Sequence, residues 1–179
     1  MKDRKYRTKS FYGISMILLI ILLVTTAGLS FPACSSSSAE VVAKKGEAVD
    51  FTLPDLDGNS VDIKDFRGNV VVLNFWAAWC PPCRAEIPDF IEVYENYRDK
   101  NVVFFGISAD DLSSLKSFSS EYGINYPTLF DKDGEVHYAF NISAIPHTFI
   151  LDKDGFEVFN QIGMMTKQQL SDAIDGAMQ

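Results

Sequence analysis

Two cysteines three residues apart are the side chains in this sequence best suited to chemistry. Cys80 and Cys83 enclose Pro81 and Pro82, directly after an apolar run. If a helix begins here, the two sulfurs can close one small disulfide ring, and the amides and dipole of the helix N-terminus favour a thiolate on Cys80. Prolines suit a first helical turn, whose N–H groups have no intrahelical acceptor. The motif predicts thiol-disulfide exchange, with Cys80 as the exposed nucleophile and Cys83 as the buried resolving thiol.

Two metal-binding alternatives stand beside this interpretation. A structural zinc site needs four ligands, whereas the sequence holds one Cys-x-x-Cys pair and two isolated histidines, His137 and His147. A copper carrier would combine the two thiols with His147, because thiolate and imidazole suit Cu(I). A single cysteine pair favours redox chemistry, and we expect neither a resident metal nor an organic cofactor.

The cysteine pair needs a strand behind it and a helix in front of it. Residues 69–76 form an almost unbroken apolar run, typical of a strand buried on both faces of a parallel sheet. After Cys83 the apolar residues change to three- and four-residue spacing, which predicts a helix to about Arg98. A second strand is expected at 102–107 and a second helix at 110–122, and together they complete a right-handed crossover unit. Leu112, Leu115 and Phe118 should lie on one face of that helix.

Shorter strands are expected on either side of this unit. The turn Asp57-Gly58-Asn59 separates two alternating runs and predicts an N-terminal β-hairpin. Late strands and a last helix are expected at 128–130, 148–151, 157–162 and from Thr166 onward. Two Asp-Lys-Asp-Gly stretches, 131–134 and 152–155, lack the spacing of a calcium-binding EF-hand and are interpreted as hairpin turns.

The charge distribution separates the N-terminus from the remainder. The formal net charge is −8, yet the first nine residues carry five basic side chains and one acidic one, so the remainder is more acidic than the whole. An acidic globular part repels phosphate backbones, which disfavours a nucleic-acid partner. Over the whole chain, aromatic residues make up 13% and hydrophobic residues 47%, which is the composition of a globular protein.

An export segment is expected at the N-terminus. Residues 10–39 carry no charge, and 14–24 are mostly aliphatic, a pattern typical of a signal peptide or a retained membrane anchor over 1–33. Either form leaves the rest of the chain outside the cytoplasm. Cys34 follows directly and is a candidate for lipidation, and 34–45 form a Ser-rich tether before a single domain over 46–179.

The segment from Asn74 to Glu86, with Pro88 after it, resembles the active site of thioredoxin-like proteins, and more narrowly the TlpA/ResA/DsbE group of membrane-bound reductases. The hairpin over 50–58 and the stretch 144–152 match the same group. The resemblance implies an α/β thioredoxin-like fold, in which a central mixed sheet is flanked by helices and extended by an N-terminal β-hairpin.

The resemblance also assigns roles to residues around the cysteines. It implies that Pro146 is cis and lies beside the disulfide, with Ile145 offering its backbone to an extended substrate; Trp79 is expected to present part of its ring to a partner. Where thioredoxins have a buried aspartate this sequence has Asn74, which cannot titrate. Glu86 is the alternative proton acceptor for the second thiol, unless it lies on a solvated helix face. His147 is expected either to influence the thiols or to pack or lie at the surface.

Three functions are compared. The resemblance favours an extracytoplasmic reductase of disulfides in exported proteins such as apocytochrome c, supplied by a membrane electron donor of the CcdA/DsbD type. A peroxiredoxin-like peroxidase would place its cysteine in a Pro-x-x-x-Thr-x-x-Cys context, which does not precede Cys80. A tethered copper-binding module would favour Cys-x-x-x-Cys spacing over the one present. The reductase is the favoured hypothesis.

Overall fold

The structure is a computed structural model in which residues 41–179 are described. The expected export segment, Cys34 and most of the tether lie outside the described residues. Between residues 41 and 179, no helix combines the length and the apolarity that crossing a bilayer requires.

The described residues form seven strands, one 3₁₀-helix and four α-helices, which confirms the thioredoxin-like α/β fold. In chain order these are β1 (Thr52–Pro54), β2 (Ser60–Asp62), η1 (Ile63–Phe66), β3 (Val70–Phe75), α2 (Pro81–Tyr97), β4 (Val102–Ser108), α3 (Leu112–Tyr122), β5 (Thr128–Phe130), α4 (Glu135–Ala139), β6 (His147–Leu151), β7 (Glu157–Ile162) and α5 (Lys167–Ala177).

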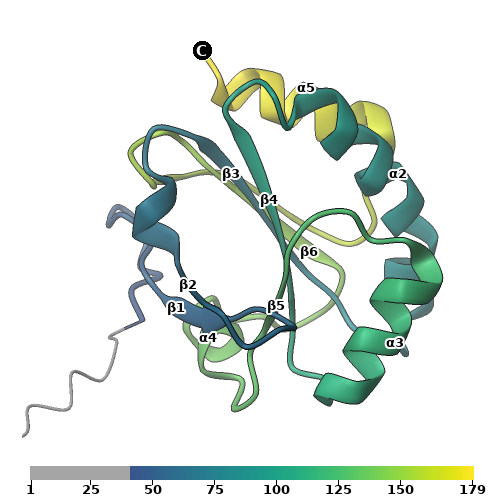
Figure 1. Cartoon of the computed structure of the whole chain (residues 1–179). Coiled ribbons are helices and arrows are strands. Elements are labelled where there is room, and N and C mark those ends of the chain that lie inside the picture. The colour runs from purple at the N-terminus through teal and green to yellow at the C-terminus, as the bar shows by residue number, and fades with distance from the viewer. Residues whose placement is uncertain (1–40) are drawn as a thin grey trace, which may run out of the picture. The chain divides into compact units, whose positions relative to one another are not determined.

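A five-stranded mixed sheet in the order β5-β4-β3-β6-β7 forms the centre (Figure 1). The central strand β3 pairs in parallel with β4 and antiparallel with β6, and β6 pairs antiparallel with β7, as the tight turn predicted. The parallel pair is joined through α2, so the crossover unit is confirmed. All six side chains of β3 are buried, which explains why its sequence shows no alternation.

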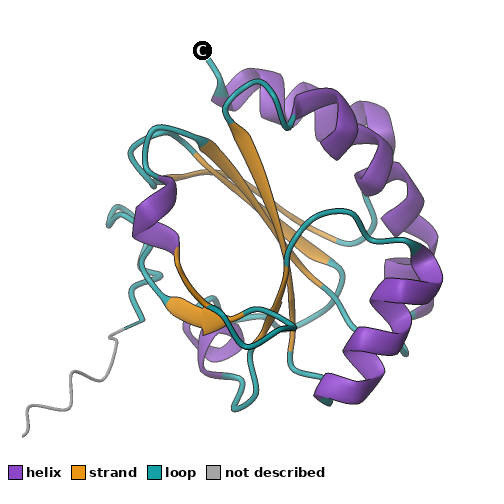
Figure 2. Ribbon diagram, in the orientation of Figure 1, coloured by secondary structure: helices purple, strands orange, loops and turns teal. Residues whose placement is uncertain are grey.

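Two cores lie on the two faces of this sheet. Val70 and Val72 pack under α2 and α5, whereas Val71 and Leu73 pack under the N-terminal hairpin and α4. The larger helices α2, α3 and α5 gather on one side and the hairpin and α4 on the other (Figure 2). Because β3 is buried from both sides, its end holds the following loop and the cysteines in a fixed position.

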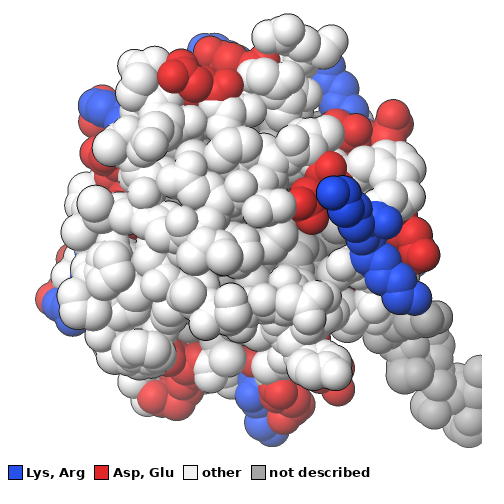
Figure 3. Space-filling view, turned by 180° about the vertical axis from the view of Figure 1, so that it is seen from behind, with Lys and Arg blue, Asp and Glu red and all other residues white. Residues whose placement is uncertain are grey.

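The two edges of the sheet differ. The β1–β2 hairpin is closed by Asp55, whose side chain accepts hydrogen bonds from the backbone N–H groups of Asp57 and Asn59. An isolated bridge from Asp55 to Leu129 places this hairpin against the outer side of β5. Within residues 41–179, the outer side of β7 has no strand partner, and Val158 and Ile162 are exposed there. The face opposite that of Figure 1 carries charges of both signs at its margins around an uncharged centre (Figure 3).

The helix α4 was not predicted. The sequence indicated a hairpin turn at 131–134; a turn is present there, but it leads from β5 into α4 and not into a second strand, so the hairpin is wrong. Asp131 instead accepts hydrogen bonds from the backbone of Val136 and His137, and Gly134 adopts a positive φ of 70° just before the helix. The equivalent stretch at 152–155 does join β6 to β7 as predicted.

The helix α3 also differs in one detail. Leu115 and Phe118 are buried as expected, but Leu112 is exposed. Asp111 caps the helix by accepting from the N–H of Ser114, so Leu112 falls in the solvent-facing first turn.

Candidate active site

Cys80 and Cys83 form a disulfide at the N-terminus of α2. Cys80 is the N-cap residue, and its sulfur accepts the backbone N–H of Cys83 at 3.3 Å. Pro81 and Pro82 occupy the first helical turn, as predicted. In this oxidised state Cys80 is 3% exposed and Cys83 is fully buried. Cys80 is thus the more accessible of the two, as predicted, but the difference in exposure is small.

The loop that precedes β6 closes over Cys80 from the other side. The peptide bond between Ile145 and Pro146 is cis, as the resemblance implied, and the Ile145 carbonyl oxygen lies 3.8 Å from the Cys80 sulfur. Ile145 therefore presents its backbone next to the reactive sulfur. An extended polypeptide lying along this loop would bring its own sulfur to Cys80.

Trp79 stands beside the disulfide with 71% of its surface exposed. Its indole Nε1 donates to one oxygen of Asp110 at 3.0 Å, and the Ala78 N–H donates to the other at 2.7 Å. Asp110 thus fixes both the indole and the loop before Cys80. Sequence reasoning missed Asp110, although it follows β4 at the same sheet end where β3 delivers the cysteines, and that shared end was a usable signal.

Glu86 lies behind the cysteines and is only 1% exposed, so the alternative of a solvated helix face is wrong. Its Oε1 accepts from the Asn74 amide at 3.0 Å, and its Oε2 accepts from the Met165 backbone N–H at 3.0 Å. The same Asn74 amide donates to Thr148 at 3.1 Å. Desolvation outweighs these hydrogen bonds and raises the pKa of Glu86 from 4.5 to about 7. One helical turn after Cys83, this carboxylate can exchange a proton near neutral pH.

The remaining predicted residues lie in the core. Trp76 is buried against Phe118, at 5.1 Å between ring centroids, as expected. His147 is also buried and packs on Phe149 at 4.2 Å, so a surface position is wrong. Along β6 alternate side chains face opposite ways, which directs His147 away from the Thr148 side, where Asn74 and Glu86 lie. Among the described residues no three metal-ligating side chains cluster, so the copper alternative lacks support from His147.

A pocket of about 520 Å³ opens beside the disulfide. It is lined by Trp76, Ala77, Trp79, Ala109, Asp110, His137, Ile142, Ser143, Ala144 and Ile145, and is called the Trp79–Ile145 pocket below. Its walls come from the ends of β3 and β4, from α4 and from the loop before β6. The pocket is mainly apolar and adjoins the backbone expected to contact substrate.

Comparisons with known proteins agree with this geometry. The model of the AhpC/TSA family matches residues 45–156. The thiol-disulfide oxidoreductase ResA of Bacillus cereus is 34% identical over 157 residues, covering 86% of this chain and 91% of ResA.

Two solved structures have the same fold. A thiol:disulfide interchange protein of Chlorobium tepidum superposes with a TM-score of 0.70 at 29% identity, covering 76% of this chain and 99% of its own. A secreted Mycobacterium tuberculosis disulfide oxidoreductase homologous to E. coli DsbE superposes with a TM-score of 0.63 at 32% identity. The match covers 70% of this chain and 95% of the M. tuberculosis chain.

Proposed function

The chain belongs to the AhpC/TSA family and, within it, to the ResA/DsbE-like thiol-disulfide oxidoreductases, and on this premise we propose that it reduces disulfides of exported proteins while tethered to a membrane. Three parts of this statement go beyond family membership: the direction of electron flow, the class of substrate and the tether.

The direction is supported by the surroundings of the two sulfurs. A strong oxidant of this chemistry needs its reduced thiolate unusually stabilised. Pro81 and Pro82 place no imidazole between the cysteines, and the ionisable group one turn away, Glu86, is a carboxylate. When ionised, a carboxylate disfavours a nearby thiolate. The burial of Glu86, one helical turn after Cys83, is the observation that carries the proposal of a reductant.

The reaction follows from the positions of these groups. The Cys80 thiolate attacks one sulfur of a substrate disulfide, forming a mixed disulfide and releasing the other substrate sulfur as a thiolate, which takes a proton from solvent. Cys83 passes its proton to Glu86 and attacks the Cys80 sulfur, which breaks the mixed disulfide and releases the second substrate sulfur as a thiolate; this thiolate takes up a proton as Glu86 loses one. Two electrons pass from the Cys80–Cys83 dithiol to the substrate, and the disulfide of this structure is restored.

The substrate and the location are inferred from several sources. The expected export segment places the domain in a compartment where disulfides persist, and the M. tuberculosis relative is described as secreted. There a reductant must receive electrons across the membrane, which supports a donor of the CcdA/DsbD type. The resemblance makes apocytochrome c the first substrate to test. A retained anchor or a lipid on Cys34 would keep the protein near such a donor.

A reduction potential tests the direction. The purified protein is equilibrated with glutathione and dithiothreitol buffers at neutral pH, and the oxidised fraction is measured by thiol alkylation and mass. We expect a value closer to that of thioredoxin, about −270 mV, than to that of a strong oxidant, about −120 mV. A potential above about −180 mV would reject the reductase assignment.

A further inference from the structure

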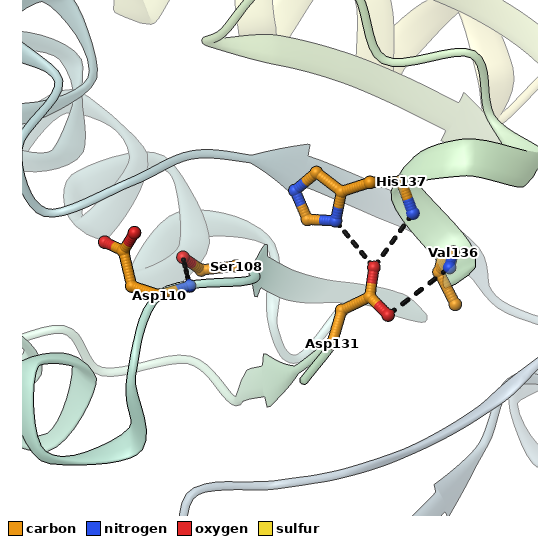
Figure 4. A network of polar contacts seen from close by, with 5 residues as sticks. All are labelled: Ser108, Asp110, Asp131, Val136 and His137. Carbon is orange, nitrogen blue, oxygen red and sulfur yellow. Dashed lines mark hydrogen bonds and ion pairs between the residues drawn. The ribbon is translucent and has the colours of Figure 1, made fainter. Parts of the chain in front are cut away.

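A histidine of α4 faces the Trp79–Ile145 pocket. His137 comes from the helix that sequence reasoning missed, and its ring packs edge-on against Phe75, with 5.0 Å between centroids and an 85° angle. Its Nδ1 lies 2.6 Å from an oxygen of Asp131. Figure 4 shows this contact and the second ring nitrogen, Nε2, turned away from Asp131.

The Asp131 carboxylate fixes which nitrogen carries the proton in the neutral ring. Asp131 is buried and also accepts the backbone N–H groups of Val136 and His137, at 3.3 and 2.9 Å. Although burial opposes the charge, the hydrogen bond with the His137 ring and those from the two backbone N–H groups together lower the pKa of Asp131, so at neutral pH it is an acceptor only. Nδ1 must then be the donor. In neutral His137, Nε2 is therefore an acceptor, and it has no hydrogen-bond partner among residues 41–179.

Apart from His137, the polar side chains of the lining are the Asp110 carboxylate and the Ser143 hydroxyl, and most of the others are apolar. Asp110 stands across from His137 in Figure 4, and each of its oxygens already accepts one hydrogen bond and retains a second lone pair. None of the ten lining residues is a lysine or an arginine. A ligand in this pocket therefore meets apolar walls, the acceptors of His137 and Asp110 and one hydroxyl, with no lysine or arginine to neutralise an acid.

The pocket lies within reach of a residue next to the target cysteine. Ile145, one of its walls, carries the carbonyl that lies 3.8 Å from the Cys80 sulfur, and Trp79 directly precedes Cys80. A volume of about 520 Å³ admits a large side chain. A substrate sulfur at Cys80 thus brings the adjoining side chain of an extended polypeptide to the pocket mouth.

We propose that the Trp79–Ile145 pocket is a side-chain subsite in which His137 selects substrates, favouring at the position next to the target cysteine a side chain with an apolar body and a hydrogen-bond-donating tip. Tyrosine and lysine fit this description, whereas phenylalanine, norleucine and glutamate do not. The inference rests on the proposed function, since it concerns polypeptide disulfides as substrates.

Matched peptide disulfides test the subsite. One pair differs by Tyr or Phe next to the target cysteine, and a second pair by Lys or norleucine, each on either side of the cysteine in turn. Reduced full-length protein is mixed with each peptide, and its oxidation is followed by tryptophan fluorescence and by thiol counting after acid quench. A single neutral hydrogen bond predicts a second-order rate constant about three- to tenfold higher for Tyr than for Phe, and Lys, whose hydrogen bond is charge-assisted, should exceed norleucine by at least as much.

Variants show whether His137 causes the preference. His137→Asn keeps an amide that can donate to Asp131 but presents nothing at the position of Nε2, and His137→Leu removes both contacts. In both variants the Tyr/Phe ratio should fall to about one, and the Lys/norleucine ratio should fall to the part that the Asp110 carboxylate sustains. Tyr138→Asn, at the neighbouring residue of α4, which is 86% exposed, should keep the wild-type ratios.

The outcomes separate the subsite from the proposed function. Equal rates within each pair for the wild type, or a Tyr/Phe ratio retained in His137→Asn, would overturn the subsite while leaving the reductase intact. A wild-type protein that reduces none of the peptides would overturn both proposals. Because each ratio is taken within one variant, a general loss of stability does not imitate the expected result.

Discussion

Replacing Glu86 with glutamine should make the oxidised protein more stable at alkaline pH. The folded protein holds the Glu86 proton more tightly than the unfolded chain, because burial raises the pKa from 4.5 to about 7. Between these two values the unfolded state releases its proton first. The free energy of unfolding therefore falls as pH rises through this window. The full difference corresponds to about 3 kcal/mol, since one pKa unit is about 1.4 kcal/mol.

Glutamine imitates the protonated acid in this network. Its carbonyl can accept from Met165, and its amide can then donate to Asn74 if that side chain turns its oxygen toward residue 86. The Asn74 oxygen is buried and has no partner among the described residues. Turning the Asn74 amide therefore breaks no hydrogen bond to that oxygen. Thr148 is a hydroxyl and can serve as donor instead of acceptor. We expect the variant and the wild type to have similar stability near pH 4.

The assay is urea unfolding of the disulfide-bonded protein at several pH values from 4 to 8. The difference in unfolding free energy should grow from near zero to about 3 kcal/mol in favour of Glu86→Gln. Burial lowers the pKa of His147, which makes stability rise with pH, but this contribution is common to both proteins and cancels. Glu121→Gln, at an exposed position of α3, should keep the wild-type profile. Parallel profiles for wild type and Glu86→Gln would refute the reasoning.

Three further predictions concern other parts of the molecule. Cys83→Ser should accumulate mixed disulfides with substrate proteins, detectable by mass; accumulation only in Cys80→Ser would reverse the assigned roles. The full-length protein should fractionate with membranes, and release of Cys34→Ala would favour a lipid anchor, whereas soluble wild-type protein would exclude both anchors. Gly106→Ala should lower stability by about 1–3 kcal/mol, because the new Cβ would lie 2.5 Å from the buried Trp76 Nε1. Gly176→Ala on α5, where a Cβ meets nothing, is its control and should not destabilise.

The main helices and strands and the cysteine pair could be predicted from the sequence because their signals are local. The apolar run of β3, the prolines after Cys80 and the spacing of α2 each depend on neighbours in the chain. The position of Glu86 in the helix contained a signal for its burial that the sequence analysis did not use. It lies three residues after Cys83 and four before Phe90, a spacing that places it on the buried stripe of α2. Its burial was therefore foreseeable, although its bond to Met165 was not.

The residues that sequence reasoning missed depend on contacts between distant segments. The helix α4 is five residues long, too short for apolar periodicity to identify, and its start is set by Asp131 before it. His137 acquires a possible role only because α4 lies beside the ends of β3 and β4. Asp110 likewise matters through Trp79, which is 31 residues earlier in the chain.

The bridge between Asp55 and Leu129 limits how sheets of this protein can join. An uncovered strand edge can template the addition of another chain, and a sheet with two such edges can grow without end. Here the N-terminal hairpin is bridged to the β5 side at Leu129, and within residues 41–179 no strand pairs with the outer side of β7. When two copies pair through β7, the β7 edge of each copy is covered by the other. Such a contact is closed by a two-fold axis. Because the hairpin stands against the β5 side, edge-to-edge pairing of the five-stranded sheet is directed to β7, where it ends at a pair.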